Sequence, residues 1–427
     1  MSQKTHAFSS TQRITIKDNL TEFPQSLFDL ADTLEILDLS GNQLNALPAN
    51  FHAFTKLRIL FLSDNNFETI PKVLAECPAL TMIGFKANQI KHIPEYALPE
   101  QIRWLILTDN QISCLPESFG RHQQLQKLML AGNAISTLPD SMVKCRKLEL
   151  CRLSANQLET LPAWLTTLPR LSWLAFAGNP CCPSQQPEKN MDEIHWNELQ
   201  ISHEIGSGAS GVISKALWKE RFDVALKAFK GDITSDGMPE DEMAISIAVG
   251  EHENLVDVVG KLTGHPENKE GLLLSLIADD YVNLAGPPSL SSCTRDTYAE
   301  GQTFSMAHLL RITTAIASVS AHIHKKGIMH GDLYGHNILI NPQANCILGD
   351  FGAATQYTSM NHQMHQGLEQ LEVRAFGCLL EELTERLSTA ENPHVLCQLK
   401  ELTASCLHES VKKRPFFKEI SELLTSF

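Results

Sequence analysis

The sequence predicts two folded parts, an α/β solenoid of short repeats followed by an α+β domain. The first part shows a regular period, because asparagine recurs at steps of 22 or 23 residues, at Asn42, Asn65, Asn88, Asn110, Asn133, Asn156 and Asn179. The second part lacks this period and contains the stretches HGDLYGHN (330–337) and LGDFG (348–352). A chain of 427 residues is also too long for one ordinary domain.

The composition excludes several classes of function. No window approaches 18 uninterrupted apolar residues, so we expect no membrane span. The start MSQKTHAFSS lacks the basic and apolar regions of a secretory signal, so we expect a cytoplasmic protein whose 11 cysteines stay reduced. The net charge of −14 comes from the residues after 185, and no basic block balances it. We therefore expect no nucleic-acid binding.

The first part follows one sequence pattern, L-x-x-L-x-L-x-x-N-x-L-x-x-L-P. Examples are LEILDLSGNQLNALP (34–48) and LQKLMLAGNAISTLP (125–139). A short strand would turn alternate leucines inward, and stacked repeats would merge them into one core. We expect each asparagine amide to bond backbone groups of the neighbouring repeat. The pattern resembles the leucine-rich repeat family, which implies an α/β leucine-rich-repeat solenoid over residues 12–182.

One face of this solenoid is predicted to bind a protein. The strand positions six and four residues before each asparagine point to the open, concave side and are mostly large and apolar. They include Ile59, Phe61, Met82, Trp104, Ile106, Met129 and Trp173, with Arg152 in the same columns. Apolar patches with aromatic, Met and Arg side chains are typical of protein contacts. The second part of this chain is one candidate occupant, and packing of these side chains on one another is the alternative.

The second part presents its motifs in a fixed order. The polar stretch PSQQPEKN predicts a linker over residues 183–194. A glycine-rich run IGSGASGV (205–212) follows, then the strand VALK (224–227), an acidic helix, HENLV (252–256) and the apolar strand LLLSLI (272–277). A long amphipathic helix over 306–327 precedes HGDLYGHN and LGDFG. The stretches EVRAFGCLLEEL (372–383) and CLHESVKKRPFFKEI (406–420) predict the last helices.

This series resembles the protein kinase family over residues 195–427. A glycine-rich turn alone is weak evidence, because dinucleotide-binding folds use a similar string, but the order of the whole series is specific. The resemblance implies an α+β bilobal protein-kinase-like domain, with an N-lobe over about 195–277 and a C-lobe over about 278–427. It also implies an enzyme that uses ATP and Mg²⁺ to transfer phosphate to an alcohol group of a protein.

The resemblance also assigns the nucleotide-binding residues. The glycines of the hairpin would let its backbone close over the phosphates. The implied ATP-binding residues are Gly206, Ser207, Gly208, Gly211, Val212, Ala225 and Lys227. The catalytic Lys227 would contact the α- and β-phosphates and would be held by a carboxylate of the next helix. Glu242 is the candidate for that carboxylate, and Glu240 and Asp241 are the alternatives.

The remaining roles fall on the two aspartate motifs. Asp350 and Asn337 are the implied Mg²⁺ ligands, since that hard cation prefers oxygen. Asp332 is the implied catalytic residue that accepts the proton of the substrate hydroxyl. His330 and Phe351 are expected to pack as spine residues. No essential polar group is missing, which argues against a fold that has lost its catalytic residues.

Two departures from the family pattern lie in HGDLYGHN. Gly331 replaces an arginine that pairs with an activation-loop phosphate in many protein kinases. Activity is therefore expected to be independent of phosphate on the loop, whose hydroxyl residues are Thr355, Tyr357, Thr358 and Ser359. Tyr334 replaces the lysine that serine/threonine kinases place near the γ-phosphate.

A third departure follows the DFG stretch. Only 22 positions separate Asp350 from Glu372, and no A-P-E triplet lies between them. The platform that holds a peptide substrate must therefore be short or rebuilt. Arg414, whose family partner is the missing glutamate, is expected to pair with Glu369 instead.

These features favour an ATP- and Mg²⁺-dependent protein kinase, specific for serine or threonine rather than tyrosine. A leucine-rich array binds proteins and would be of no use to an enzyme acting on a small alcohol. One alternative is a pseudokinase scaffold that binds nucleotide, which the short segment after DFG supports. Another is a small-molecule phosphotransferase, because HGDL also resembles aminoglycoside and choline phosphotransferases, although those families lack the DFG string.

Overall fold

The computed structural model describes residues 12–183, 191–208, 210–231, 233–388 and 392–427. Contacts within the chain define two compact units. One unit holds residues 1–148 and 156–164, and the other holds residues 149–155 and 165–427. Part of the predicted linker, residues 184–190, and the start MSQKTHAFSS lie outside the described residues. The boundaries 12–182 and 195–427 stay predictions, since two repeat segments belong to the second unit by their contacts.

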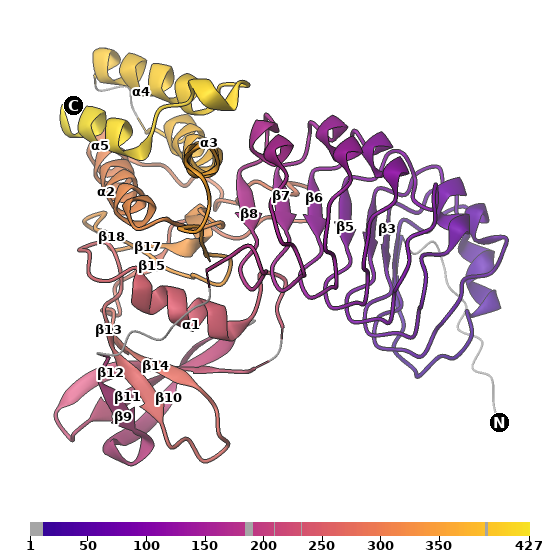
Figure 1. The fold of residues 1–427 in the computed structure, drawn as a ribbon, viewed down its shortest axis with the longest axis horizontal. Coiled ribbons are helices and arrows are strands. Elements are labelled where there is room, and N and C mark those ends of the chain that lie inside the picture. The colour runs from indigo at the N-terminus through magenta and orange to yellow at the C-terminus, as the bar shows by residue number, and fades with distance from the viewer. Residues whose placement is uncertain (1–11, 184–190, 209, 232, 389–391) are drawn as a thin grey trace. The chain divides into compact units, whose positions relative to one another are not determined.

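The first unit is a stack of short parallel strands, each paired with the next one along the chain. Each has three residues, and the middle residue of β2 to β6 is fully buried. Figure 1 shows these strands side by side. They are β1 (Arg13–Thr15), β2 (Ile36–Asp38), β3 (Ile59–Phe61), β4 (Met82–Gly84), β5 (Trp104–Ile106) and β6 (Lys127–Met129).

The repeat asparagines hold neighbouring rungs together, as predicted. Asn42 donates from its amide to the carbonyl of Ile16 at 2.8 Å and accepts from the backbone nitrogen of Leu20 at 3.0 Å. Asn65 repeats this one rung later with Leu39 and Leu44, at 3.0 and 2.9 Å. Each buried amide thus satisfies backbone groups that no strand partner reaches.

Short 3₁₀ helices return the chain on the side opposite the strands. A proline precedes most of them, since its fixed φ suits a segment that leaves regular structure. They are Gln25–Leu30, Phe51–Ala53, Lys72–Glu76, Glu117–Arg121, Asp140–Lys144 and Ala163–Thr167.

The second unit combines the two strands β7 (Leu150–Arg152) and β8 (Trp173–Ala175), which pair in parallel, with the predicted bilobal domain. Its N-lobe is a six-stranded sheet in the order β10-β11-β12-β14-β13-β9, antiparallel except for β13 with β9. The strands are β9 (Glu193–His195), β10 (Leu199–Ser207), β11 (Gly211–Trp218), β12 (Phe222–Phe229), β13 (Val258–Thr263) and β14 (Gly271–Ser275). The helix α1 (Pro239–Ala248) follows β12.

The C-lobe is mainly helical. Its helices are α2 (Met306–Lys325), α3 (His362–Glu385), α4 (Pro393–Cys406) and α5 (Phe417–Thr425). Two small antiparallel sheets carry the loops of interest. They consist of β15 (Val282–Asn283), β17 (Ile338–Ile340) and β18 (Cys346–Leu348), and of β16 (Ile328–Met329) and β19 (Thr355–Gln356). Short 3₁₀ helices are Trp196–Glu198, Gly335–Asn337 and Val411–Lys413.

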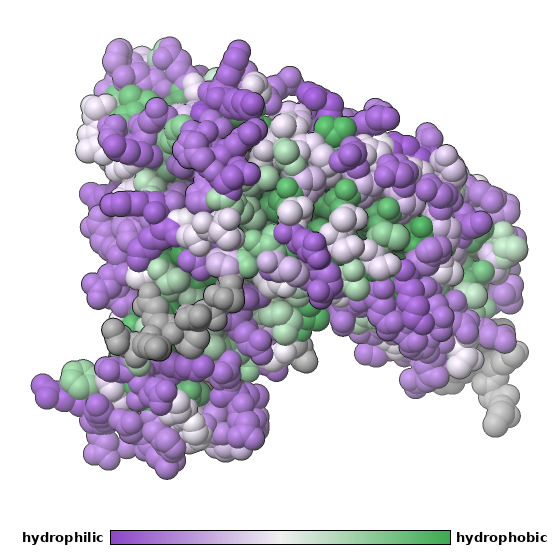
Figure 2. Space-filling model, in the orientation of Figure 1, coloured by the Kyte–Doolittle hydropathy of each residue, from purple (hydrophilic) through white to green (hydrophobic). Residues whose placement is uncertain are grey.

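The predicted fold class, a leucine-rich-repeat solenoid followed by a bilobal protein-kinase-like domain, is confirmed. The predicted helix over 306–327 is α2, which packs against α5. Among the described residues, no helix combines the length and the apolar character needed to cross a bilayer. The N-lobe surface at the lower left of Figure 2 is largely hydrophilic.

Candidate active site

The glycine-rich hairpin joins β10 and β11. The backbone nitrogen of Gly208 donates to the carbonyl oxygen of Gly211 at 2.9 Å, which closes the turn. A Cβ atom on Gly211 would lie 2.7 Å from the carbonyl oxygen of Ala228 on the next strand, so a larger residue would push the two strands apart. Gly206 and Ser207 end β10. The predicted hairpin is therefore present, with glycine where strand packing needs it.

A cavity of about 450 Å³ lies beneath this hairpin and reaches into the C-lobe. Its walls are mostly apolar, and they include Ala225, Val258, Leu272, Leu274, Leu339 and Leu348. Three charged residues that the sequence predicts, Lys227, Glu242 and Asp350, also line it. An apolar pocket with a few polar groups is the usual form of a small-molecule site.

Lys227 on β12 pairs with Glu242 on α1. Glu242 is 3% exposed, so this ion pair is almost fully shielded from water. Its second carboxylate oxygen, Oε2, has no hydrogen-bond partner within the described part of the chain. The alternatives Glu240 and Asp241 make no ion pair with Lys227 among the described residues. Burial raises the pKa of Asp241 to about 6, with the nearby Glu240 charge adding to the effect.

Of the predicted nucleotide-binding residues, Ala225 and Lys227 line the cavity, whereas Gly206, Ser207, Gly208, Gly211 and Val212 do not. Val212 does not line the cavity, whereas its neighbour Ile213 does. Val212 faces a separate hollow beside Trp196 and Leu226. Adjacent residues of a strand point to opposite faces of the sheet, so Ile213 rather than Val212 faces the cavity, and the ATP-binding role of Val212 stays a prediction. The period-two alternation of β11 could have identified Ile213.

The loop HGDLYGHN brings Asp332 and Asn337 together. The side-chain nitrogen of Asn337 donates to Oδ2 of Asp332 at 2.8 Å and to its backbone carbonyl at 2.9 Å. His330 is fully buried and packs against Phe351, with ring centroids 5.0 Å apart. Its Nε2 donates to the carbonyl of Gly349 at 2.9 Å. His330 and Phe351 thus pack between the two aspartate loops, as expected for spine residues.

Glu372 on α3 fixes the backbone of this loop. Its fully buried carboxylate accepts from the nitrogens of His330 and Gly331, at 3.0 and 2.6 Å, and from His324 at 2.7 Å. Burial alone would raise the pKa of Glu372, but the hydrogen bond and charge of His324 outweigh it and lower the pKa. The sequence identified the helix but not this residue. The structure gives Glu372 the role of loop anchor, because a charged acceptor holds two successive N–H groups.

Asp350 follows β18 and lies at the cavity. Its backbone has a φ of 56°, an unusual value for a non-glycine residue. Its carboxylate accepts from the nitrogen of Gly352 at 3.2 Å. The nitrogen of Gly349 donates to the carbonyl of Asn337 at 2.9 Å, so the two predicted metal ligands lie on adjoining segments.

The structure adds a residue to the site that the sequence did not assign to it. Arg152, the last residue of β7, pairs with Oδ1 of Asp332 and donates from Nε to Asp236 at 2.6 Å. Its Nη1 donates to the carbonyl of Gly331 at 2.8 Å. Burial raises the pKa of Asp332, but the Arg152 charge and neighbouring histidines outweigh it, so the pKa is lowered overall. The signal in the sequence was an arginine in a column whose other members, apart from Asp38, are uncharged.

The position of strand β8 explains why a glycine, Gly331, stands before Asp332. Gly331 has a φ of 72°, and a Cβ atom there would lie 2.6 Å from the carbonyls of both Leu174 in β8 and Ala353. Trp173 of β8 stacks on Tyr334 and donates from its indole nitrogen to the carbonyl of Leu333 at 3.1 Å. The close approach of β8 therefore excludes the arginine that many protein kinases have at this position.

The short segment after DFG is also held by the residues around β8. Thr355 in β19 accepts from the nitrogen of Phe176 at 3.1 Å, and Ser359 donates to the carbonyl of Cys181 at 2.9 Å. Arg374 on α3 donates to Ser172 at 2.7 Å. In Figure 1, β8 lies beside α3. Residues 172–181 thus hold this segment in place. That the segment is a rebuilt platform for a peptide substrate stays a prediction.

The expected pairing of Arg414 with Glu369 is wrong. Arg414 is buried and donates to three backbone carbonyls, those of His408, Gln370 and Pro169, at 3.0, 3.0 and 2.7 Å. Glu369 accepts from the nitrogen of Phe417 at 2.9 Å instead. Carbonyl oxygens can satisfy a guanidinium without a carboxylate, because its five N–H groups point in several directions.

The predicted protein-binding face is partly covered. Ile59, Met82 and Met129 are buried, whereas Phe61, Trp104 and Ile106 are half-buried. The ammonium of Lys127 lies 4.2 Å from the Trp104 ring centroid, so some side chains of this face pack on one another. Trp173 is 1% exposed beneath Tyr334 of the same chain, which corrects its assignment to a face open to other proteins.

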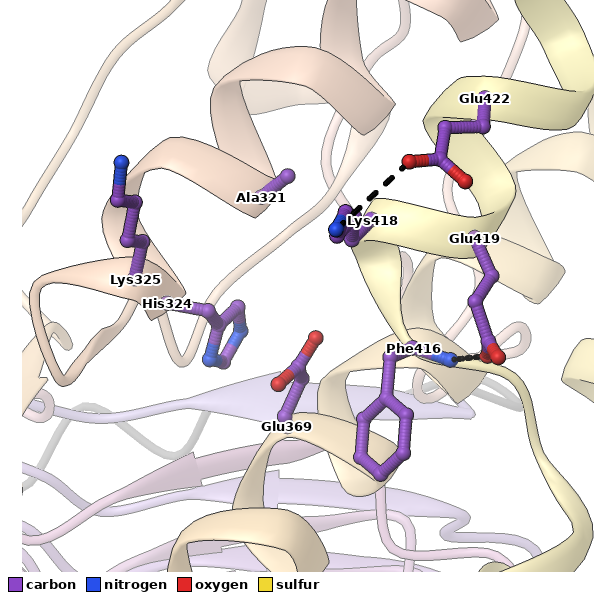
Figure 3. Close-up of a pocket in the computed structure, with 8 residues that line it drawn as sticks. All are labelled: Ala321, His324, Lys325, Glu369, Phe416, Lys418, Glu419 and Glu422. Carbon is purple, nitrogen blue, oxygen red and sulfur yellow. Dashed lines mark hydrogen bonds and ion pairs between the residues drawn. The ribbon is translucent and has the colours of Figure 1, made fainter.

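A second hollow, of about 530 Å³, lies in the C-lobe among α2, α3 and α5. Figure 3 shows that its lining side chains carry both charges, with Lys418 beside Glu422 and Glu419 on the nitrogen of Phe416. None of the predicted nucleotide, metal or catalytic residues lines it. We therefore place the candidate active site at the cavity beneath the glycine-rich hairpin.

The sequence matches two families. Residues 32–90 and 100–158 match the leucine-rich repeat family, and residues 199–377 match the protein tyrosine and serine/threonine kinase family. Both predicted resemblances are thus confirmed.

Individual relatives agree with the second match. A probable serine/threonine-protein kinase of Dictyostelium discoideum is 27% identical over 57% of this chain and 29% of its own length. The serine/threonine-protein kinase mos of Gallus gallus is 27% identical over 46% of this chain and 59% of its own. Protein-tyrosine kinase 6 of Homo sapiens is 23% identical over 58% of this chain and 61% of its own length. This chain therefore spans less than two thirds of each of these relatives.

Proposed function

We propose that this chain, which combines leucine-rich repeats with a protein kinase domain, transfers the γ-phosphoryl group of ATP to hydroxyl groups of proteins. The observation that carries the proposal is the buried Lys227–Glu242 ion pair at the edge of an open cavity. Protein kinases need this pair and the DFG aspartate in place at the same time. Both line the same cavity here.

The cavity fits a nucleotide. Its apolar walls suit a purine base, and Lys227 and Asp350 lie where phosphates and their counterion would follow. The free Oε2 of Glu242 is a buried acceptor without a donor among the described residues, as expected where a ligand or its water completes the site. Lys227 would hold the α- and β-phosphates, and the glycine-rich hairpin would cover them.

The residues present also fit Mg²⁺. This cation takes one or two protein oxygens and completes its coordination with phosphate oxygens and water. Asn337 donates its amide nitrogen to Asp332, which leaves the amide oxygen as a ligand. The Asp350 carboxylate would be the other ligand. When bound, Mg²⁺ would neutralise charge on the transferred phosphoryl group.

Asp332 would accept the proton of the substrate hydroxyl. Its carboxylate is held on both sides, by Arg152 at Oδ1 and by Asn337 at Oδ2. Glu372 fixes the backbone of the same loop. A base held in this way needs little rearrangement when the hydroxyl arrives, which is the basis of its contribution to the rate.

We propose serine or threonine as the acceptor. Two of the three relatives named above are serine/threonine kinases, and the third is a tyrosine kinase. A peptide library with matched serine, threonine and tyrosine acceptors would decide between them. Labelling of tyrosine peptides alone would contradict this part of the proposal.

We also propose that the first unit binds the protein substrate or a partner through its strand face. The half-buried Phe61, Trp104 and Ile106 supply an apolar surface there. Trp104→Ala should weaken capture of that partner while leaving labelling of a generic basic protein unchanged.

A nucleotide-binding scaffold is the second candidate. The pairing of Arg152 with Asp332 favours it, since this arginine engages the proposed base. A scaffold would bind nucleotide in the cavity and transfer no phosphate.

One comparison separates the two candidates. Wild type, Lys227→Ala and Asp332→Asn are incubated with radiolabelled ATP, Mg²⁺ and a generic basic protein. Lys269→Ala serves as the matched control, because Lys269 is exposed in the N-lobe and pairs only with Glu267 among the described ion pairs. A protein kinase labels the protein with wild type and Lys269→Ala, and the Asp332 variant loses roughly 10²–10⁴-fold. Nucleotide binding without label in every variant would support the scaffold.

A further inference from the structure

Carboxylates outnumber cations around the place of phosphotransfer. Asp236 lies within electrostatic reach of both Asp332 and Asp350. The charge of Lys227 is already paired with Glu242. A bound triphosphate would bring more negative charge to the same place. Such an arrangement needs a further positive charge, because like charges at short range in a partly buried site repel strongly.

Arg152 supplies a positive charge at this point, which it shares between the carboxylates of Asp236 and Asp332. Its side chain is 2% exposed, and its three nitrogens contact three different groups. They are the carboxylate of Asp236 before α1, the carbonyl of Gly331 and the carboxylate of Asp332. A planar guanidinium that donates in several fixed directions holds its partners more rigidly than an ammonium would. Arg152 thus joins an N-lobe segment to the loop that contains the proposed base.

The loop HGDLYGHN has no lysine at position 334, where serine/threonine kinases place one near the γ-phosphate. Tyr334 occupies that place, and its ring is stacked on Trp173 with centroids 4.3 Å apart. Tyr334 is buried, and its hydroxyl has no partner in the described part of the chain. The same two strands, β7 and β8, therefore bring in an arginine and cover the residue that replaces the family's lysine.

We propose that Arg152, a residue of the repeat sequence, is a positioning residue of the phosphotransfer site that orients Asp332 and replaces the positive charge missing at position 334. This inference rests on the proposed kinase function. It assigns the last strands of the repeat a part in the reaction, in addition to any role in binding proteins. The repeat and the kinase sequence would then form one catalytic assembly.

An inhibitory role for Arg152 is the contrasting reading, because the arginine engages Oδ1 of the proposed base. Two observations favour positioning over inhibition. Arg152 does not line the nucleotide cavity, which remains open. The Lys227–Glu242 pair and the Asp332–Asn337 hydrogen bond are both formed while Arg152 is in place. The groups that phosphotransfer requires are therefore assembled together with this arginine.

The test measures kcat and KM for ATP of Arg152→Gln and Arg152→Lys in the full chain, with radiolabelled ATP, Mg²⁺ and a generic basic protein. Arg170→Gln is the matched control, because Arg170 is a half-exposed arginine on the next repeat that lies 3.9 Å from Glu149. Affinity for a fluorescent ATP analogue and the melting temperature are measured for every variant. They report whether the cavity and the fold are intact.

We expect kcat of Arg152→Gln to fall roughly 10²-fold, as for removal of one fixed electrostatic group, with KM for ATP and analogue affinity within about twofold. Arg152→Lys should lose about tenfold, because it keeps the charge and loses the geometry. Unchanged or increased kcat in Arg152→Gln would overturn the inference, and an increase would indicate inhibition.

If Arg152→Gln does not fold, Arg152→Lys carries the test, and a lysine variant as active as wild type would overturn the inference. A wild type that binds the analogue but labels nothing would overturn the proposed function itself. The two failures are distinguishable, because the first requires an active wild type.

Discussion

Trp173 and Tyr334 stack face to face, with ring centroids 4.3 Å apart and planes 7° from parallel. The indole nitrogen also donates to the carbonyl of Leu333, next to the proposed base Asp332. This contact joins the last repeat strand to the loop that the reaction would use. It explains why an aromatic residue is acceptable at position 334.

Trp173→Ala should therefore affect both stability and phosphotransfer. Truncation of a buried tryptophan typically costs about 3–5 kcal/mol, and the loop beside Asp332 would lose its support. Trp104→Ala is the control, since Trp104 is only half-buried and lies in the first unit. Urea unfolding and label transfer measure the two effects. If Trp173→Ala and Trp104→Ala behave alike in both assays, the stack has no special role.

Gly331→Ala should destabilise the protein far more than its backbone angle alone requires. The added Cβ would lie 2.6 Å from the carbonyl oxygens of Leu174 and Ala353. Gly301 provides a matched control, because its φ of 74° is similar and no atom lies within 4 Å of its Cβ position. Gly301→Ala should cost about 1–2 kcal/mol, the usual penalty of a left-handed residue. Equal unfolding free energies for the two variants would contradict the crowding argument.

Much of the site could be predicted because its residues belong to local motifs. Lys227, Asp332, Asn337 and Asp350 lie in short strings whose spacing is set by strands and turns. Lys227 and Asp350 line the cavity, and Asp332 and Asn337 are joined by a hydrogen bond. The partner of Lys227 could not be fixed in this way, since the register of the helix leaves Glu240 and Asp241 as alternatives to Glu242. The pairing with Lys227 shows which of them points toward β12.

Contacts distant in sequence could not be predicted in this way. Arg152 and Asp332 are 180 positions apart, so no motif contains both. The acceptors of Arg414 are backbone carbonyls, which every residue has, so the sequence gives no sign of them. Val212 and Ile213 are a different case, because strand alternation is sufficient to place Ile213 at the cavity.

Stability should decline below about pH 6.5 because of His122 in the first unit. Burial lowers the pKa of His122 to about 4, with the charge of Arg121 adding to the effect. The unfolded chain therefore binds a proton near pH 6.5, where the folded chain does not, and folding loses free energy as pH falls between these values. From pH 6.5 to pH 5 the loss is about 1.6 kcal/mol, less than the full slope of roughly 1.4 kcal/mol per pH unit because half of the unfolded histidine is already protonated at pH 6.5.

Urea unfolding at pH 6.5 and pH 5 measures this loss. His122→Phe should remove most of it, because the variant has no group that titrates there and keeps an aromatic ring beside Phe119. His52→Gln is the control for loss of a histidine from the first unit, since His52 is about half exposed. An unchanged pH dependence in His122→Phe would show that other groups cause the decline.

Activity should not require phosphate on the segment after DFG. Thr355 and Tyr357 are buried, with Thr355 bonded to Phe176 and the Tyr357 hydroxyl 2.7 Å from Nδ1 of His324. Another kinase could reach only Thr358 and Ser359, which are exposed. Contacts from residues 165–182 already order this segment, so a phosphate has no ordering role left to play. Thr358→Ala and phosphatase-treated wild type should retain label transfer within about twofold of untreated protein, which corresponds to a change of less than about 0.5 kcal/mol in the activation free energy. Loss of transfer after phosphatase treatment, with recovery on rephosphorylation, would show that the segment is a switch.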